Sequence, residues 1–158
     1  MSLTYAEITV GRELVTYART VTEADLVAFT CFAGLKLPIF VDAEFARTQS
    51  AYGERIVPGF LTCSIVGGMM EGVLGPSTVG ALGMDEVRFP RPVKPGDTIH
   101  ARITVDEKRD LKDGRRGLVA MTVRAFNQTG AQVLHLKNKA ILWREPPASG
   151  LPEPIVEI

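Results

Sequence analysis

The chain contains little cysteine and little histidine, and this scarcity limits the metal and redox chemistry open to it. Only two cysteines, Cys31 and Cys63, and two histidines, His100 and His135, occur among 158 residues. The two cysteines do not form a Cys-x-x-Cys pair, so the sequence indicates neither a zinc motif nor a disulfide framework. We therefore expect no metal site and, by default for such a chain, a reducing, cytoplasmic location.

An excess of charge of one sign is also absent. Lysine and arginine total 18, as do aspartate and glutamate, and the sequence pI is near 6.7. Domains that bind nucleic acid usually carry a strongly basic face, so nucleic acid is not an expected partner. The densest basic segment, from Lys108 to Arg116, is interrupted by Asp110 and Asp113 and is typical of a solvated hairpin tip.

Long hydrophobic runs are missing as well. The N-terminal residues MSLTYAEITVG lack the basic stretch and apolar run of a signal peptide. The longest apolar stretch, Gly59 to Leu74, is shorter than the roughly 20 residues that a membrane span needs, and it contains Glu71. We interpret it as a buried helix and expect no membrane partner. The hydrophobic fraction of 46% is typical of a globular domain.

The first half of the chain is predicted to be mainly helical. Thr22 and Asp25 have the spacing of a capping box, which satisfies free amides at a helix start. Asp42 precedes a second helical pattern, and the apolar segment before it is interrupted by Pro38, which indicates an ordered loop. The predicted segments are a strand at Glu13–Val21, helices at Thr22–Gly34 and Ala43–Gln49, a loop at Leu35–Val41, a turn at Gly53–Pro58 and a long helix from Gly59.

After Pro76 the pattern changes to that of strands separated by the turn sequences PRPVKPGD, KDGRR and NQTG. The short connections predict antiparallel neighbours. A helix that is apolar on nearly every side has to be surrounded, and a twisted sheet can curl around it. The predicted strands are Thr78–Phe89, Asp97–Lys108, Gly117–Asn127 and Ala131–Arg144.

These patterns predict an α+β fold in which an antiparallel sheet wraps around a long central helix. One domain is expected over residues 1–145, followed by a proline-rich tail over residues 146–158.

Three segments resemble the MaoC-like dehydratases and (R)-specific enoyl-CoA hydratases. The first, AFTCFAGLKLPIFVDAEFA, resembles the family signature, and YGERIVPGFLTCSIVGGMM resembles its turn into the central helix. The third, EVRFPRPVKPGDTIHARITV, resembles a family strand with its Arg-Pro and Pro-Gly-Asp-Thr turns. The resemblance covers nearly the whole chain to about Trp143. It implies the hot-dog fold and a site for an acyl thioester.

Two catalytic positions of the signature are occupied by apolar residues. In this family an Asp and a His are understood to hold one water and to move its proton. Counting back from Asp42, these positions fall on Leu35 and Phe40, the signature's Asn falls on Leu37, and a His of the central-helix turn falls on Pro58. Leucine and phenylalanine cannot titrate, so the catalytic residues are unknown and hydration is expected to be impaired.

The other half of the implied site is retained. Pro58 suits the first turn of a helix, and the amides of Gly59, Phe60 and Leu61 are expected to point at a thioester carbonyl oxygen. Pro38, Asp42 and Arg55 match the family pattern and are expected to be structural near the site. The expected substrate-binding residues are Leu35, Phe40, Pro58, Gly59, Phe60 and Leu61.

Other candidates have plainer interpretations. The two histidines lie in predicted strands, where a structural role is the default, and Lys36 is expected to be solvated. Cys63 is either an inert buried thiol or one whose pKa the helix start lowers. Of the adjacent Asp85 and Glu86, at most one can face the site.

Two classes of function remain open. The chain is either an acyl-CoA or acyl-phosphopantetheine binding protein, impaired in hydration or serving as a non-catalytic subunit, or an enzyme with non-standard residues. The enzyme alternatives are an enoyl-CoA hydratase, a 3-hydroxyacyl dehydratase and a thioesterase. No cofactor is expected beyond coenzyme A as part of the ligand. The hot-dog resemblance implies a homodimer, or a hetero-oligomer with another hot-dog protomer.

Overall fold

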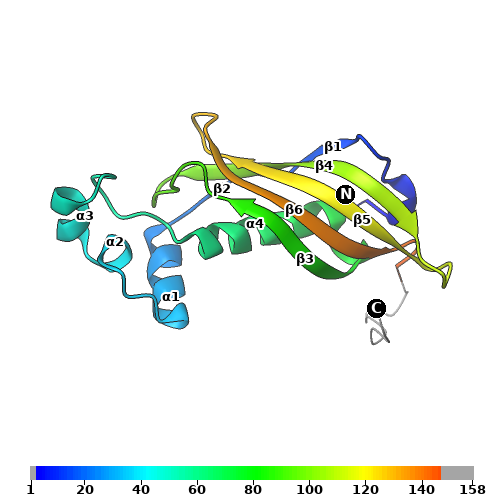
Figure 1. Ribbon diagram of the computed structural model, residues 1–158, viewed down its shortest axis with the longest axis horizontal. Coiled ribbons are helices and arrows are strands. Elements are labelled where there is room, and N and C mark those ends of the chain that lie inside the picture. The colour runs from blue at the N-terminus through cyan, green and yellow to red at the C-terminus, as the bar shows by residue number, and fades with distance from the viewer. Residues whose placement is uncertain (1–2, 147–158) are drawn as a thin grey trace.

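The structure, a computed structural model, describes residues 3–146, so the predicted tail beyond Pro146 lies outside the described residues. An antiparallel sheet packs on one long helix, and three shorter helices lie beyond one end of the sheet (Figure 1). The main sheet has the strand order β1-β4-β5-β6-β3, and β2 pairs separately with β4. The elements are η1 (Tyr5–Glu7), β1 (Glu13–Val15), β2 (Arg19–Thr20), α1 (Glu23–Ala33), α2 (Pro38–Val41), α3 (Ala43–Gln49), α4 (Gly59–Leu74), η2 (Gly75–Ser77), β3 (Thr78–Arg88), β4 (Thr98–Asp110), β5 (Arg116–Phe126) and β6 (Gln132–Trp143).

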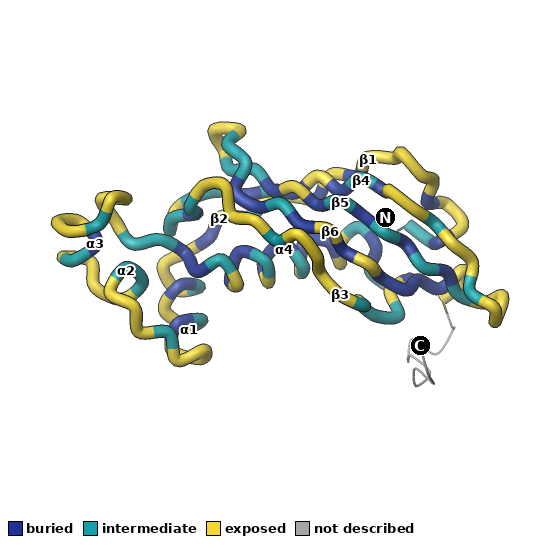
Figure 2. Tube along the Cα trace, in the orientation of Figure 1, coloured by how far each residue is buried: buried dark blue, intermediate teal, exposed yellow. Residues whose placement is uncertain are grey.

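The three central strands carry the core on one face. Along β5 buried side chains alternate with less buried ones, because successive residues of a strand point to opposite faces. Val119, Met121 and Val123 are buried in one cluster with Ile65 and Met69 of α4. The tube in Figure 2 shows this alternation and the buried side of α4. The central helix is therefore held by the inward face of the sheet.

The sheet covers only part of α4. Its bounds agree with the predicted helix, but Phe60 is 77% exposed, and Ser64, Gly68 and Glu71 are exposed on successive turns. The predicted arrangement of an antiparallel sheet around the long helix is therefore confirmed, and one face of the helix is left uncovered by residues 3–146. The physical reason is that the sheet is open, so it cannot close around the helix.

The neighbour of β3 also differs from the prediction. β4, β5 and β6 pair consecutively, but β3 pairs with β6 and lies at the edge opposite β1. The connection from β3 to β4 is too long and too rich in proline for a hairpin turn. It crosses near the start of α4, where the amide of Val57 donates to the carbonyl of Val93 over 2.7 Å.

The predicted first strand is broken into β1 and β2. The side-chain oxygen of Thr16 accepts a hydrogen bond from the amide of Ala101 over 2.9 Å, and its hydroxyl donates to the carbonyl of Tyr17 over 2.8 Å. A side chain that takes the place of a backbone acceptor interrupts the ladder. The regular pairing with β4 is reduced to the two short strands, and single backbone bonds continue beside them, such as that from the amide of Thr16 to the carbonyl of Ala101 over 2.9 Å.

The first helix confirms the predicted caps, whereas the following segment corrects a prediction. Thr22 and Asp25 form the capping box of α1, which ends at Gly34 with φ of 66°. Residues 38–41 form a short helix rather than the predicted loop, because the fixed φ of Pro38 suits a first helical position. Asp42 caps α3 through a 2.9 Å bond from the amide of Phe45.

Among the helices of residues 3–146, none combines the length and the apolarity required to cross a membrane.

Candidate functional site

A pocket of about 350 Å³ lies at the start of α4. Its walls come from α2, from the loop and first turn of α4, from the β3–β4 connection and from the start of β6. The lining residues are Phe40, Tyr52, Ile56, Val57, Gly59, Thr62, Phe89, Pro90, Arg91, Pro92, Val93 and Val133. The volume lies within the range of about 300–1,000 Å³ that is usual for sites that bind small molecules.

The ring of Phe89 lies directly against the first residue of α4. A methyl group added at Gly59 would lie only 2.5 Å from Cζ of Phe89 and 2.6 Å from its Cε2. Carbon atoms in contact are normally about 3.5–4.0 Å apart, so only glycine allows this approach. Phe89 is 46% exposed, so its ring forms an outer wall of the pocket rather than part of the core.

Two backbone amides at the start of α4 are free among the described residues. No hydrogen-bond partner is found there for the amides of Gly59 and Phe60. The amide of Leu61 donates to the carbonyl of Pro58 over 3.0 Å, as does that of Thr62 over 3.1 Å. The prediction of a free Leu61 amide is therefore wrong, because the first turn closes on that carbonyl. Free amides at a helix start carry partial positive charge and favour an oxygen with developing negative charge.

The predicted substrate-binding residues are only partly brought together. Phe40 and Gly59 line the pocket, and Pro58 is buried as the residue before the helix. Leu61 is buried in the core, and the side chain of Phe60 points to solvent. Leu35 does not line the pocket. It is half-buried just after α1, where its amide donates to the carbonyl of Thr30 over 2.9 Å.

The three residues expected to be structural near the site all support the surrounding backbone. Pro38 begins α2, and its carbonyl accepts from the amide of Asp42 over 2.8 Å. Asp42 then caps α3. Arg55 forms an ion pair with Glu23 of α1, which ties the loop before α4 to the first helix.

The described pocket lining carries few groups that titrate. Tyr52 and Arg91 are its only titratable side chains among the described residues, and neither a carboxylate nor an imidazole is present. Lys94, on the same connection as Arg91, is already paired with Glu54 over 2.6 Å. Such a pocket can bind and orient a thioester, but it offers no carboxylate–imidazole pair for moving a proton.

The alternative catalytic groups lie elsewhere. His100 stacks on Phe126 with ring centroids 5.9 Å apart, and His135 is a half-buried residue of β6 that does not line the pocket. Lys36 is exposed. Burial raises the pKa of the Cys63 thiol, so the alternative of a lowered pKa is wrong.

Neither carboxylate of the acidic pair enters the pocket. Asp85 lies 3.6 Å from Lys139, and Glu86 lies 2.8 Å from Lys137. The hydrogen bond from Lys137 lowers the pKa of Glu86. Both carboxylates reach the outer face because β3 is irregular here, with a register shift after Asp85 and a φ of 53° at Glu86.

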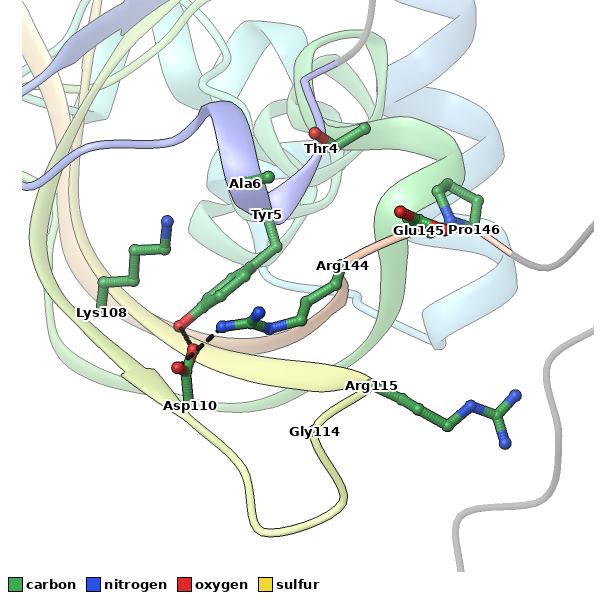
Figure 3. A pocket seen from close by; sticks show the side chains of 10 residues that line it. All are labelled: Thr4, Tyr5, Ala6, Lys108, Asp110, Gly114, Arg115, Arg144, Glu145 and Pro146. Atoms are coloured by element: carbon green, nitrogen blue, oxygen red, sulfur yellow. Dashed lines mark hydrogen bonds and ion pairs between the residues drawn. The ribbon is translucent and has the colours of Figure 1, made fainter.

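A second, more open pocket at the other end of the sheet is held together by its own charges (Figure 3). Tyr5 donates to Asp110 over 2.7 Å, and Arg144 pairs with the same carboxylate over 2.7 Å. Burial and the bond to Asp110 raise the pKa of Tyr5 to about 12. Lys108 lies 4.2 Å from the centre of the Tyr5 ring and donates to the carbonyl of Ile8.

These contacts attach η1 to the sheet. They correct the interpretation of the basic segment as a solvated tip, because Lys108 packs on the ring of Tyr5. Sequence reasoning missed Tyr5, because its partners lie more than a hundred residues away.

Comparison with known proteins identifies the family. Residues 6–127 match the family described as MaoC like domain, and the chain belongs to that family. R-hydratase PhaJ1 from Pseudomonas aeruginosa is 35% identical, with a TM-score of 0.77, over 91% of this chain and 88% of that one. Beta-methylmalyl-CoA dehydratase from Chloroflexus aurantiacus is 30% identical over 87% of this chain and 39% of that protein.

The structural comparison also confirms the predicted hot-dog fold. Rv0216 from Mycobacterium tuberculosis, described as a double hotdog fold, matches with a TM-score of 0.80 over 92% of this chain and 45% of that one. Its identity of 20% shows the fold alone. The chain spans between 23% and 39% of the length of three curated relatives that it matches.

Proposed function

We propose that this chain binds an acyl thioester of coenzyme A or phosphopantetheine and is impaired in the hydration typical of its family, so that it serves as a non-catalytic subunit. The observation that carries the proposal is the pocket at the start of α4. It combines the start of α4, where the amides of Gly59 and Phe60 are free among the described residues, with a lining that contains Phe40, which we align with the histidine of the signature. The names of two relatives, Beta-methylmalyl-CoA dehydratase and Mesaconyl-CoA hydratase, support the ligand class.

The amides of Gly59 and Phe60 would hold the thioester carbonyl oxygen. Their partial positive charge, with the helix dipole behind it, polarises a carbonyl and acidifies the neighbouring carbon. Hydration needs, in addition, a water and a base next to the double bond. Leu35 and Phe40 supply neither. The ligand is therefore bound and polarised without being hydrated, and no cofactor is required beyond coenzyme A itself.

The proposed assembly is at least a dimer, formed with a second copy or with another hot-dog protomer. The edge strand β3 has a partner on one side only among the described residues, and Met84 on it is 51% exposed. Phe60 is also largely exposed on α4. Unpaired edges and large apolar side chains favour association. A sedimentation mass of 17.2 kDa at micromolar concentration would contradict this proposal.

Hydration of crotonyl-CoA tests the chemical part of the proposal. The unaltered protein should bind the thioester in calorimetry but hydrate it slowly or not at all. Each missing acid–base group typically costs about 10²- to 10⁴-fold in rate. The double variant Leu35→Asp with Phe40→His should recover only a small part of the activity, because the amides of Gly59 and Phe60 remain in place and Phe40 lines the pocket, whereas Leu35 does not.

The single variants are the matched controls, since either group alone should give little hydration. A new Asp in an apolar site has a raised pKa and costs stability, so thermal unfolding of every variant should be measured alongside. Fast hydration by the unaltered protein would favour the alternative, an active hydratase with non-standard residues. Hydrolysis to free coenzyme A would instead favour a thioesterase.

A further inference from the structure

Four basic side chains form one row across the outer face of the sheet, on strands that lie side by side in Figure 1. Strand pairing places the members opposite one another in the order Arg102 of β4, Arg124 of β5, His135 of β6 and Arg88 of β3. Residues that pair in this way point to the same face of a sheet. Neighbouring strands are about 4.8 Å apart, so this basic row spans about 14 Å.

The basic row points to solvent. Its three arginines are exposed, and His135 is half-buried. The chain neighbours of Arg124, Val123 and Ala125, are buried on the side of α4. Successive side chains of a strand alternate between the two faces, so the row lies on the face away from the helix.

The charges of the basic row are poorly compensated within the chain. Like charges directly opposite each other on a sheet are destabilising. Among residues 3–146, Arg124 has no hydrogen bond or ion pair, and Arg88 donates only to the carbonyl of Val87, over 2.9 Å. Arg102 is paired with Glu13 over 3.2 Å. A row that costs stability and lacks partners in the chain indicates an anionic partner from outside.

One end of the basic row lies beside the thioester pocket. Arg88 precedes Phe89, and His135 is two residues beyond Val133; both Phe89 and Val133 line the pocket. A strand advances about 3.3 Å per residue, so His135 is about 7 Å from Val133. The other members follow at one or two strand spacings. An extended phosphopantetheine arm is about 15 Å long, so a molecule seated on the row can place its thioester in the pocket.

The basic row is an open surface rather than a hollow. None of its members lines either pocket described above. Nucleotides and other small ligands usually bind in concave sites, whereas a protein partner can meet an exposed surface of complementary charge. The open face therefore favours a protein over the nucleotide part of free coenzyme A.

The positive charge does not extend beyond the basic row along β6. The next two cations there are paired, Lys137 with Glu86 over 2.8 Å and Lys139 with Asp85 over 3.6 Å. A domain that binds nucleic acid usually carries a broader basic face. A narrow row fits a single acidic element of a protein better.

We propose that the basic row docks an acidic carrier protein, which delivers the acyl group to the pocket on its phosphopantetheine arm. This inference rests on the proposed function and names the partner that supplies the ligand. Acidic residues three or four positions apart on a helix lie about 5–6 Å from one another, close to the strand spacing of about 4.8 Å. An acidic helix laid across the strands can therefore pair with several members of the row at once.

Calorimetry with one acyl group on two supports tests this assignment. The probes are crotonyl-CoA and an acidic acyl carrier protein loaded with crotonyl on its phosphopantetheine. Arg124→Glu should weaken binding of the loaded carrier about tenfold or more, because the reversed charge repels an acidic partner. Binding of crotonyl-CoA should stay unchanged, since Arg124 lies outside the pocket. Arg124→Gln should weaken the carrier by less.

The matched control is Lys112→Glu, which makes the same change of charge on the exposed β4–β5 hairpin, at the opposite end of the sheet. It should leave the affinity for both probes unchanged. Urea unfolding separates docking from a structural role. Arg124→Glu removes a like charge beside Arg102, so its unfolding midpoint should be unchanged or higher. Loss of stability along with loss of carrier binding would overturn the assignment.

Other outcomes would overturn the assignment and leave the proposed function standing. Equal weakening of both probes by Arg124→Glu would assign the row to the phosphates of coenzyme A. Unchanged binding of the carrier, or tighter binding of a DNA duplex than of the carrier, would exclude the proposed partner. A lower sedimentation mass of Arg124→Glu would make the row a subunit contact. Absence of binding by both probes to the unaltered protein would overturn the proposed function as well.

Discussion

The contact between Gly59 and Phe89 gives a prediction about the candidate site that is independent of the ligand. A β-carbon at Gly59 would lie 2.5–2.8 Å from three atoms of the Phe89 ring. That is roughly 1 Å inside the normal contact distance of about 3.5–4.0 Å. Overpacking of this kind typically costs about 1–3 kcal/mol. Because the ring is 46% exposed and can turn away, we expect Gly59→Ala to cost about 1 kcal/mol.

A double-mutant cycle isolates this contact. Urea unfolding should be measured for the unaltered protein, Gly59→Ala, Phe89→Ala and the double variant. In the Phe89→Ala background the new methyl group meets no ring, so Gly59→Ala should be close to neutral there. The expected coupling is about 1 kcal/mol, within the range of about 0.5–3 kcal/mol found for residues in contact.

Binding in the pocket should respond to the same substitution. A ring displaced from the start of α4 changes a wall of the pocket. Gly59→Ala should therefore weaken acyl-CoA binding by more, in free energy, than it lowers the free energy of unfolding. If the substitution cost the same stability in both backgrounds, the cost would not come from Phe89, and the described contact would be refuted.

Three further predictions concern stability and electrostatics. Gly117→Ala should destabilise by about 1–3 kcal/mol in urea, because its β-carbon would lie 2.1 Å from the buried Tyr5 ring; a neutral result would contradict the packing of η1. The bond from the amide of Thr22 holds the pKa of Asp25 below its usual value, so the unfolded state binds more protons. The contribution of Asp25 to the free energy of unfolding should therefore be present above about pH 4 and be lost as the pH falls through the lower pKa of the folded state. In Asp25→Asn, the free energy of unfolding should depend less on pH in this range. Acyl-CoA affinity should decrease as salt rises, and Arg91→Gln should reduce that slope if this residue meets the phosphates; an unchanged slope would assign the phosphates to other basic residues.

Much of the local structure could be predicted from the sequence because its causes are local. The capping box at Thr22, the cap at Asp42 and the bounds of α4 each depend on residues within a few positions of one another. Strand alternation and the turn sequences placed β3 to β6 within about two residues of their observed ends. The motifs that carry the family resemblance are also local, and they led to the family that the comparisons identify.

Tertiary structure decided what depends on distant residues. The pairing of β3 with β6 rather than β4 is set by how the chain crosses the start of α4, which no short segment encodes. The same crossing brings the Phe89 ring onto Gly59, and the pairing places Arg88 opposite His135 in the basic row. These contacts join residues far apart in the chain, so their physical consequences arise only when the sheet and helix pack together.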